Sequence, residues 1–199
     1  MLRQDFHPGG DLRTLLERQR TLSRNLSRFY AAEIVDGVAC LHSAGVIHRN
    51  LKPEHILINE DGHIVICGFG KSKEFQRSPI QPATTGNTAN ALCGTAEYFA
   101  PEVIKGLPYT HEVDWWCLGI ILYEMLMGIV SASLLSFSVP ELIEIPSLVF
   151  PEQRPFDADN MSDMFVRILQ DEVQLPEDHV MDQHTKDFIQ GVSICLVST

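Results

Sequence analysis

The sequence has little positive charge. Its 199 residues include 15 lysines and arginines against 26 aspartates and glutamates, which gives a formal net charge of −11. Non-specific binding to nucleic acid or to an anionic membrane surface needs basic patches, so this composition argues against both. We therefore expect no nucleic acid and no membrane among its partners, whereas a basic protein partner suits the charge.

Cysteine is also scarce and scattered. The five cysteines are odd in number and form no Cys-x-x-Cys pair. This usage argues against a disulfide framework and against a structural zinc site. No charged segment followed by an apolar one opens the chain, so we expect no secretory signal. These absences predict a cytoplasmic or nuclear protein with reduced thiols.

Long apolar runs are few, with one exception. The 25 residues from Trp115 to Val139 contain a single charge, Glu124. By length alone this run can span a bilayer. We prefer a buried core helix that continues into an apolar insertion, because Asp114 precedes the run and Gly128 interrupts it. The length and the 45% apolar content fit one globular domain with a hydrophobic core.

One stretch, His48 to Gly70, organises the chain. It reads HRNLKPEHILINEDGHIVICGFG. Two short apolar runs, 56–58 and 64–67, flank an Asp-Gly turn, which predicts a loop followed by a small β-hairpin.

Helical spacing and capping residues surround this stretch. A short helix is expected after Asp11, and a longer one from its N-cap Ser23 to a stop at Gly45. Thr110 is expected to cap a helix at about 111–128. Two further helices are predicted at 161–170 and 182–190, and the polar stretch 71–99 is predicted to be a long loop.

These motifs resemble those of eukaryotic protein kinases. HRNLKPEH and GFG stand where that family has a catalytic loop HRDLKPEN and a DFG motif. Residues 93–102, CGTAEYFAPE, are close to the CGTPEYLAPE of the AGC group, which includes cyclic-AMP-dependent kinase. Residues 114–119 match the family's DxWxxG. The resemblance covers roughly residues 4–128 and 155–191.

The resemblance implies a mainly α (α+β) fold, the C-terminal lobe of a protein kinase with one or two small β-hairpins. The upper lobe, with its GxGxxG loop, VAIK lysine and helix-C glutamate, is expected to be missing. The implied organisation is a hinge remnant at 1–10, a C-lobe core at 11–128, an atypical apolar insertion at 129–154, a truncated end of the lobe at 155–191 and an atypical tail at 192–199. Within the core lie the catalytic loop (48–55), hairpin (56–67), activation segment (68–102) and central helix (about 111–128). For the insertion and the tail, a real protein segment and a translated intron both stay open.

The chain departs from the family at the residues that do its chemistry. Asn50 replaces the catalytic aspartate, and His55 and Gly68 replace the two metal ligands. An amide is not basic, an imidazole suits Mg²⁺ poorly, and glycine has no side chain to offer. Loss of a general base alone typically costs roughly 10²–10⁴-fold in rate. We therefore expect no metal site and no catalysis.

Other positions keep the family's residues. Lys52, which contacts the transferred phosphate in the family, and Thr95 remain, while Ala91 replaces the usual activating phosphothreonine. The residues that floor the adenine pocket correspond to Leu12 and Leu57, with plain core packing as the alternative. Structural roles are implied for five residues: His48, Arg49, Phe69, Glu102 and Asp114. In the family, the histidine packs on the phenylalanine, the Asp114 equivalent accepts hydrogen bonds from the catalytic-loop backbone, and the Glu102 equivalent pairs with an arginine near the C-terminus.

Three carboxylates suggest a binding function. In AGC kinases, acidic residues at the positions of Asp11, Glu54 and Glu124 face arginines of the substrate peptide, and arginine–carboxylate pairing is bidentate and specific. Scattered surface carboxylates are the alternative. The resemblance thus implies a basic peptide or protein as partner, possibly another kinase.

Three functions follow from the sequence. The first is a pseudokinase or kinase remnant that binds a basic peptide or a kinase partner and needs no cofactor. The second is a serine/threonine protein kinase that uses ATP and Mg²⁺, truncated here by gene modelling. The third is a non-functional fragment.

Overall fold

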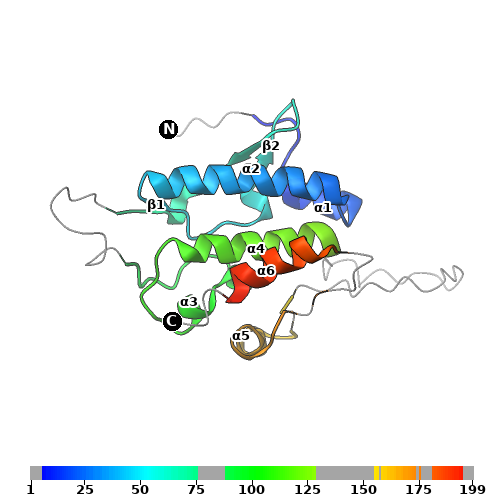
Figure 1. Cartoon of the computed structure of the whole chain (residues 1–199). Coiled ribbons are helices and arrows are strands. Elements are labelled where there is room, and N and C mark those ends of the chain that lie inside the picture. The colour runs from blue at the N-terminus through cyan, green and yellow to red at the C-terminus, as the bar shows by residue number, and fades with distance from the viewer. Residues whose placement is uncertain are drawn as a thin grey trace, which may run out of the picture.

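A computed structural model describes residues 6–75, 88–128, 155–156, 158–173, 175 and 181–194. The expected insertion at 129–154, the first five residues of the hinge remnant, the middle of the activation segment and residues 195–199 of the tail lie outside this part. The described part is mainly helical with two small antiparallel sheets (Figure 1). The prediction of a mainly α fold with one or two small β-hairpins is therefore confirmed.

The first two helices begin at side-chain caps. Helix α1 (Leu12–Gln19) starts at Asp11, whose carboxylate accepts the Thr14 N–H at 2.7 Å. Helix α2 (Arg24–Ser43) starts at the predicted cap Ser23, whose hydroxyl accepts the Leu26 N–H at 3.3 Å. Gly45 follows the end of α2 with φ +79°, a conformation that glycine adopts without strain.

The predicted hairpin lies against α2. Strands β2 (Ile56–Ile58) and β3 (Ile64–Ile66) pair antiparallel, with Leu57 opposite Val65. The approach of α2 is close, because a Cβ added at Gly37 would lie 2.7 Å from the Ile66 side chain. A second pair, β1 (Val46–Ile47) with β4 (Lys73–Glu74), joins the strand before the catalytic loop to the start of the activation segment.

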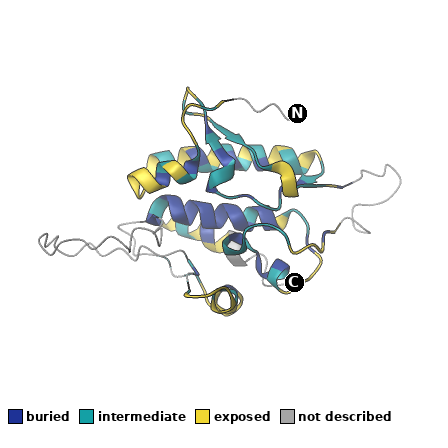
Figure 2. Cartoon of the chain, turned by 180° about the vertical axis from the view of Figure 1, so that it is seen from behind, coloured by how far each residue is buried: buried dark blue, intermediate teal, exposed yellow. Residues whose placement is uncertain are grey.

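Helix α4 (Glu112–Met127) is the centre of the fold. Thirteen of its residues are buried, and it lies between α2 and α6 (Gln183–Ile194) (Figures 1 and 2). Its apolar composition is explained by this burial on all sides. In the part of the chain that the structure describes, no helix is both long and apolar enough to cross a membrane.

The expected cap of α4 was wrong. The helix begins after His111, whose backbone is already helical, and the Thr110 hydroxyl contacts the Glu112 carboxylate instead of a backbone N–H. Helix α5 (Met161–Gln170) has the predicted bounds, and α6 continues four residues beyond the predicted end. Short elements complete the lobe: η1 (Pro53–His55), η2 (Phe69–Lys71), η3 (Ala96–Tyr98) and α3 (Pro101–Ile104).

Candidate functional site

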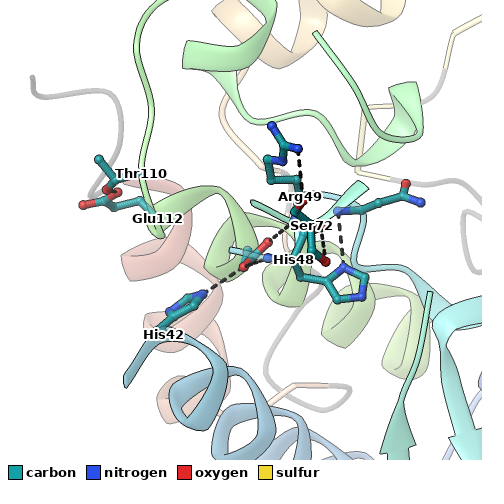
Figure 3. A network of polar contacts seen from close by, with 8 residues as sticks. His42, His48, Arg49, Ser72, Thr110 and Glu112 are labelled. Carbon is teal, nitrogen blue, oxygen red and sulfur yellow. Dashed lines mark hydrogen bonds and ion pairs between the residues drawn. The ribbon is translucent and has the colours of Figure 1, made fainter. Parts of the chain in front are cut away.

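A buried carboxylate organises the loop that carries the candidate site. Asp114, fully buried on α4, accepts the backbone N–H groups of His48 and Arg49, both at 2.8 Å. Its second oxygen also lies 2.8 Å from Nε2 of His42 at the end of α2. Figure 3 shows His42 and the backbone of His48 and Arg49 converging on this point. The end of α2 and the catalytic loop are thereby held to α4, which is more than 60 residues further along the chain.

The ring of His48 is part of the same core. It is fully buried, its Nε2 lies 2.8 Å from the Cys67 carbonyl oxygen, and its centroid lies 5.1 Å from that of Phe69. Because a carbonyl can only accept, Nε2 carries the proton, and Nδ1 accepts the Asn50 N–H at 3.3 Å. Burial lowers the pKa of His48, which keeps the ring neutral.

Asn50, at the position of the missing base, is held by hydrogen bonds. Its side-chain oxygen accepts the Thr95 hydroxyl at 3.0 Å, and its carbonyl oxygen accepts Nδ1–H of His55 at 2.7 Å. The loop therefore keeps a defined shape through an amide that cannot remove a proton from a substrate hydroxyl.

His55 and Gly68 are complementary in shape. A Cβ added at Gly68 would lie 2.5 Å from two ring carbons of His55 and 2.6 Å from its Nδ1, much closer than carbon atoms approach. Gly68 also has φ +84°, which disfavours any side chain. The imidazole thus fills the space in which an acidic side chain would begin.

Arg49 is engaged by the backbone of the activation segment. Its Nε donates to the Lys71 carbonyl at 2.6 Å and its Nη2 donates to the Ser72 carbonyl at 3.3 Å (Figure 3). Ala91, at the usual phosphate position, contributes its carbonyl oxygen to the Tyr109 hydroxyl at 2.7 Å. The segment is held here by contacts that need no phosphate.

The residues matched to the nucleotide pocket differ in how far they are exposed. Leu12 is fully buried. Leu57 is partly buried beside Asp11, and Phe69 is 46% exposed. The Lys52 ammonium lies 4.0 Å from the Glu54 carboxylate, a weak ion pair at a partly exposed position.

The three carboxylates matched to peptide binding also differ in exposure and in their hydrogen-bond partners. Asp11 caps α1, while the Glu54 side chain is 40% exposed, although its Oε2 is buried and has no hydrogen-bond partner among the described residues. Glu124 is fully buried and accepts the Tyr98 hydroxyl at 2.8 Å. The structure therefore presents Glu54 at the surface but not Glu124, which needs a local opening to reach a peptide.

Glu102 is half-buried on α3. One of its carboxylate oxygens has no hydrogen bond within the described residues, and burial raises the pKa of this side chain. No group of three or more histidine, cysteine or acidic side chains that could hold a metal is found among the described residues.

The comparisons with known proteins decide the family. The protein kinase domain family matches residues 1–193. The chain belongs to the protein kinase family. It is 36% identical over 187 residues to the serine/threonine-protein kinase gad8 of Schizosaccharomyces pombe. The matched region is 94% of this chain and 27% of that protein. It is 38% identical over 172 residues to the serine/threonine-protein kinase Sgk2 of Homo sapiens, 86% of this chain and 38% of that protein. The chain thus spans well under half the length of these relatives, and the AGC-like resemblance is confirmed.

Sequence reasoning missed two features of this kinase-like site. His42 contacts the buried carboxylate of Asp114, and its ring stacks near His111, with centroids 4.6 Å apart. A histidine in the last helical turn carries no sequence signal for this contact. The complementarity of His55 and Gly68 did have a signal, because both replacements occur in one short stretch.

Proposed function

We propose that this chain is a catalytically inactive kinase-like domain that binds an arginine-containing peptide or the basic surface of a protein partner. One observation carries the loss of catalysis. The His55 ring occupies the space over Gly68, so the site lacks an acidic metal ligand and also the room for one.

The chemistry of phosphoryl transfer supports this proposal. The reaction depends on positioned divalent ions that neutralise developing charge, and on an acceptor for the substrate proton. Gly68 offers no ligand, and the Asn50 oxygen is already an acceptor for Thr95. Neighbouring residues do not replace these functions, because Lys52 is a cation and Thr95 is a neutral donor.

Peptide binding rests on a different part of the site. The Glu54 side chain is 40% exposed beside the loop, and its Oε1 lies 4.0 Å from the Lys52 ammonium. A guanidinium can donate a charge-assisted hydrogen bond to the exposed part of this carboxylate. The net charge of −11 adds long-range attraction for a basic partner.

Metal binding tests the first part. We expect calorimetric titration with Mn²⁺ to show no specific binding to the chain. The triple variant Asn50→Asp, His55→Asn, Gly68→Asp restores oxygen ligands and should gain a saturable site. Specific Mn²⁺ binding by the unaltered chain would contradict the proposal.

Fluorescence anisotropy with a labelled peptide containing three arginines tests the second part. Glu54→Gln should weaken binding about three- to tenfold, because a charge-assisted pair is lost. Glu74→Gln, an exposed carboxylate on β4, is the matched control and should have little effect. Equal binding to the chain and both variants would refute the role of Glu54.

A second candidate is a serine/threonine kinase activity that depends on a longer protein. The intact loop frame around Asp114 and the retained Lys52 favour it. Its signature would be transfer of phosphate from ATP to a basic peptide that disappears in Lys52→Ala.

A further inference from the structure

The loop that carries Asn50 is locally basic, although the chain as a whole has a formal net charge of −11. The loop and the start of the activation segment, residues 48–55 and 64–75, hold four basic side chains and two acidic ones: Arg49, Lys52, Lys71 and Lys73, with Glu54 and Glu74. The two segments touch, because Arg49 donates to the backbone carbonyls of residues 71 and 72 at 2.6 and 3.3 Å (Figure 3). Positive charge therefore exceeds negative charge at the candidate site, which favours an anion.

Lys52 is the cation at this site that can serve a ligand. Within the described residues its ammonium has one charged neighbour, the Glu54 carboxylate at 4.0 Å, and this distance is too long for a hydrogen bond. By contrast, the Lys73 ammonium already donates to the Thr88 carbonyl at 2.6 Å, and Arg49 is engaged by backbone carbonyls. The three N–H donors of Lys52 thus need an acceptor from outside the described structure.

Asn50 offers a neutral donor two residues before this lysine. Its side-chain oxygen accepts the Thr95 hydroxyl at 3.0 Å, which fixes the orientation of the amide. The amide nitrogen on the other side forms no hydrogen bond with the described residues. A ligand with several acceptor oxygens can therefore bond to Asn50 and to Lys52.

Two replacements remove charges that would repel such a ligand. The family has aspartates at the positions of Asn50 and Gly68, and in the absence of metal ions these would oppose a second anion. Here an amide and a hydrogen atom stand in their place. A phosphoserine side chain carries a charge of about −1.5 to −2 at neutral pH and three strong acceptor oxygens. It therefore suits this site better than an uncharged serine hydroxyl does.

The spacing of Lys52 and Glu54 relates a phosphate to an arginine. The charged ends of the two side chains are 4.0 Å apart. An extended peptide presents residues i and i+2 on the same face, whereas neighbouring residues point to opposite faces. A phosphate at Lys52 and a guanidinium at Glu54 therefore come from residues two apart in such a peptide. Their charges then alternate with those of the loop, which is favourable.

We propose that the site binds a phosphorylated basic peptide, with the phosphate at Lys52 and Asn50 and an arginine two residues away at Glu54. This inference rests on the proposed function, because it keeps the arginine contact at Glu54 and adds the phosphate. The chain then recognises the product of a kinase and not its substrate. Binding involves no covalent step.

Fluorescence anisotropy tests this with labelled peptides that differ in one phosphate. In the first pair, arginines stand two residues before and two residues after a central serine, which is either phosphorylated or not. A second pair of the same composition has the arginines next to that serine. In buffer with EDTA, the chain should bind the phosphorylated peptide of the first pair about tenfold more tightly, because a charge-assisted contact is gained. In the second pair this preference should be about threefold or less, since phosphate and guanidinium cannot reach both side chains together.

Two pairs of variants locate the phosphate. Lys52→Ala should reduce the tenfold preference to about twofold, whereas Lys105→Ala, exposed after α3, should leave it unchanged. Asn50→Asp should abolish the preference, because a carboxylate then faces the phosphate, whereas Asn59→Asp on the hairpin should not. Circular dichroism verifies that each variant is folded.

The outcomes separate this inference from the proposed function. Glu54-dependent binding of the unphosphorylated peptide, with no preference for phosphate, would overturn the inference and leave the proposed function standing. No binding of either form would overturn both. A preference that survives Lys52→Ala and Asn50→Asp, or that is equal in the two pairs of peptides, would show that the phosphate binds elsewhere and would also overturn the inference.

Discussion

Two neighbouring regions of this lobe differ in how far they keep the family's residues. Around Asp114, the hydrogen bonds and the burial that shape the catalytic loop are complete. In the same loop and its hairpin, Asn50, His55 and Gly68 replace the residues with which the family carries out its reaction. The first region stabilises the fold independently of the second one, because the partners of Asp114 are two backbone N–H groups and the His42 ring. The comparison teaches that the hydrogen bonds that shape the catalytic loop do not depend on the family's residues at 50, 55 and 68.

The largest effect on stability should come from removing the Asp114 carboxylate, which accepts hydrogen bonds from the catalytic loop. Asp114→Ala leaves two buried N–H groups without an acceptor and removes the partner of His42. We expect a loss of about 3–5 kcal/mol in the free energy of unfolding, measured by urea denaturation. Asp36→Ala, an exposed aspartate on α2, is the control. A loss below about 1 kcal/mol would show that the frame is not held by this carboxylate.

A smaller effect on stability is expected at the replaced position 68. Gly68→Asp forces a side chain against His55 and into a left-handed backbone conformation, which should cost roughly 2–4 kcal/mol in stability. His55→Ala should rescue part of this cost, and a double-mutant cycle should give a coupling above about 1 kcal/mol. Independent, additive effects of the two substitutions would mean that the ring of His55 does not exclude a side chain at 68.

The buried ring of His48 joins the two regions and should make stability depend on pH. Its pKa is lowered by burial, so below pH 6.5 the unfolded chain binds a proton that the folded chain resists. The contribution of the neutral ring is present above pH 6.5 and is lost as the pH falls below it. His48→Phe should reduce the slope of unfolding free energy between pH 5.5 and 6.5 by at most about 1.4 kcal/mol per pH unit. Urea midpoints at several pH values measure this slope, and an unchanged slope would contradict the prediction.

The sequence was most informative where local signals decide the structure. Ser23 and Gly45 mark the ends of α2 in both the sequence and the structure, because capping and left-handed turns depend on adjacent residues. The predicted cap at Thr110 was wrong, because the backbone is already helical at His111 and the Thr110 hydroxyl contacts the Glu112 carboxylate.

The sequence was less informative where distant segments meet. The burial of Glu124 against Tyr98 and the contact of His42 with Asp114 are tertiary facts, and no spacing in the chain encodes them. The same is true of a groove between α2, α4 and α6, whose walls come from three separate helices. The three replaced residues at 50, 55 and 68 were visible in the sequence, but the shape match of two of them was not.

The smallest change in stability is expected for a substitution at Asn50. Asn50→Asp restores the family's base in a nearly identical shape, and the Thr95 hydroxyl can still donate to it, so we expect a stability change within about 1 kcal/mol. Phosphate transfer from ATP to a basic peptide should remain undetectable, because a base without metal ligands leaves the developing charge on phosphate unneutralised. A radiolabel transfer assay on the single variant measures this, with Asn59→Asp on the hairpin as a control of the same chemistry. Turnover in Asn50→Asp alone would show that one residue, and not the filled metal site, separates this chain from an active kinase.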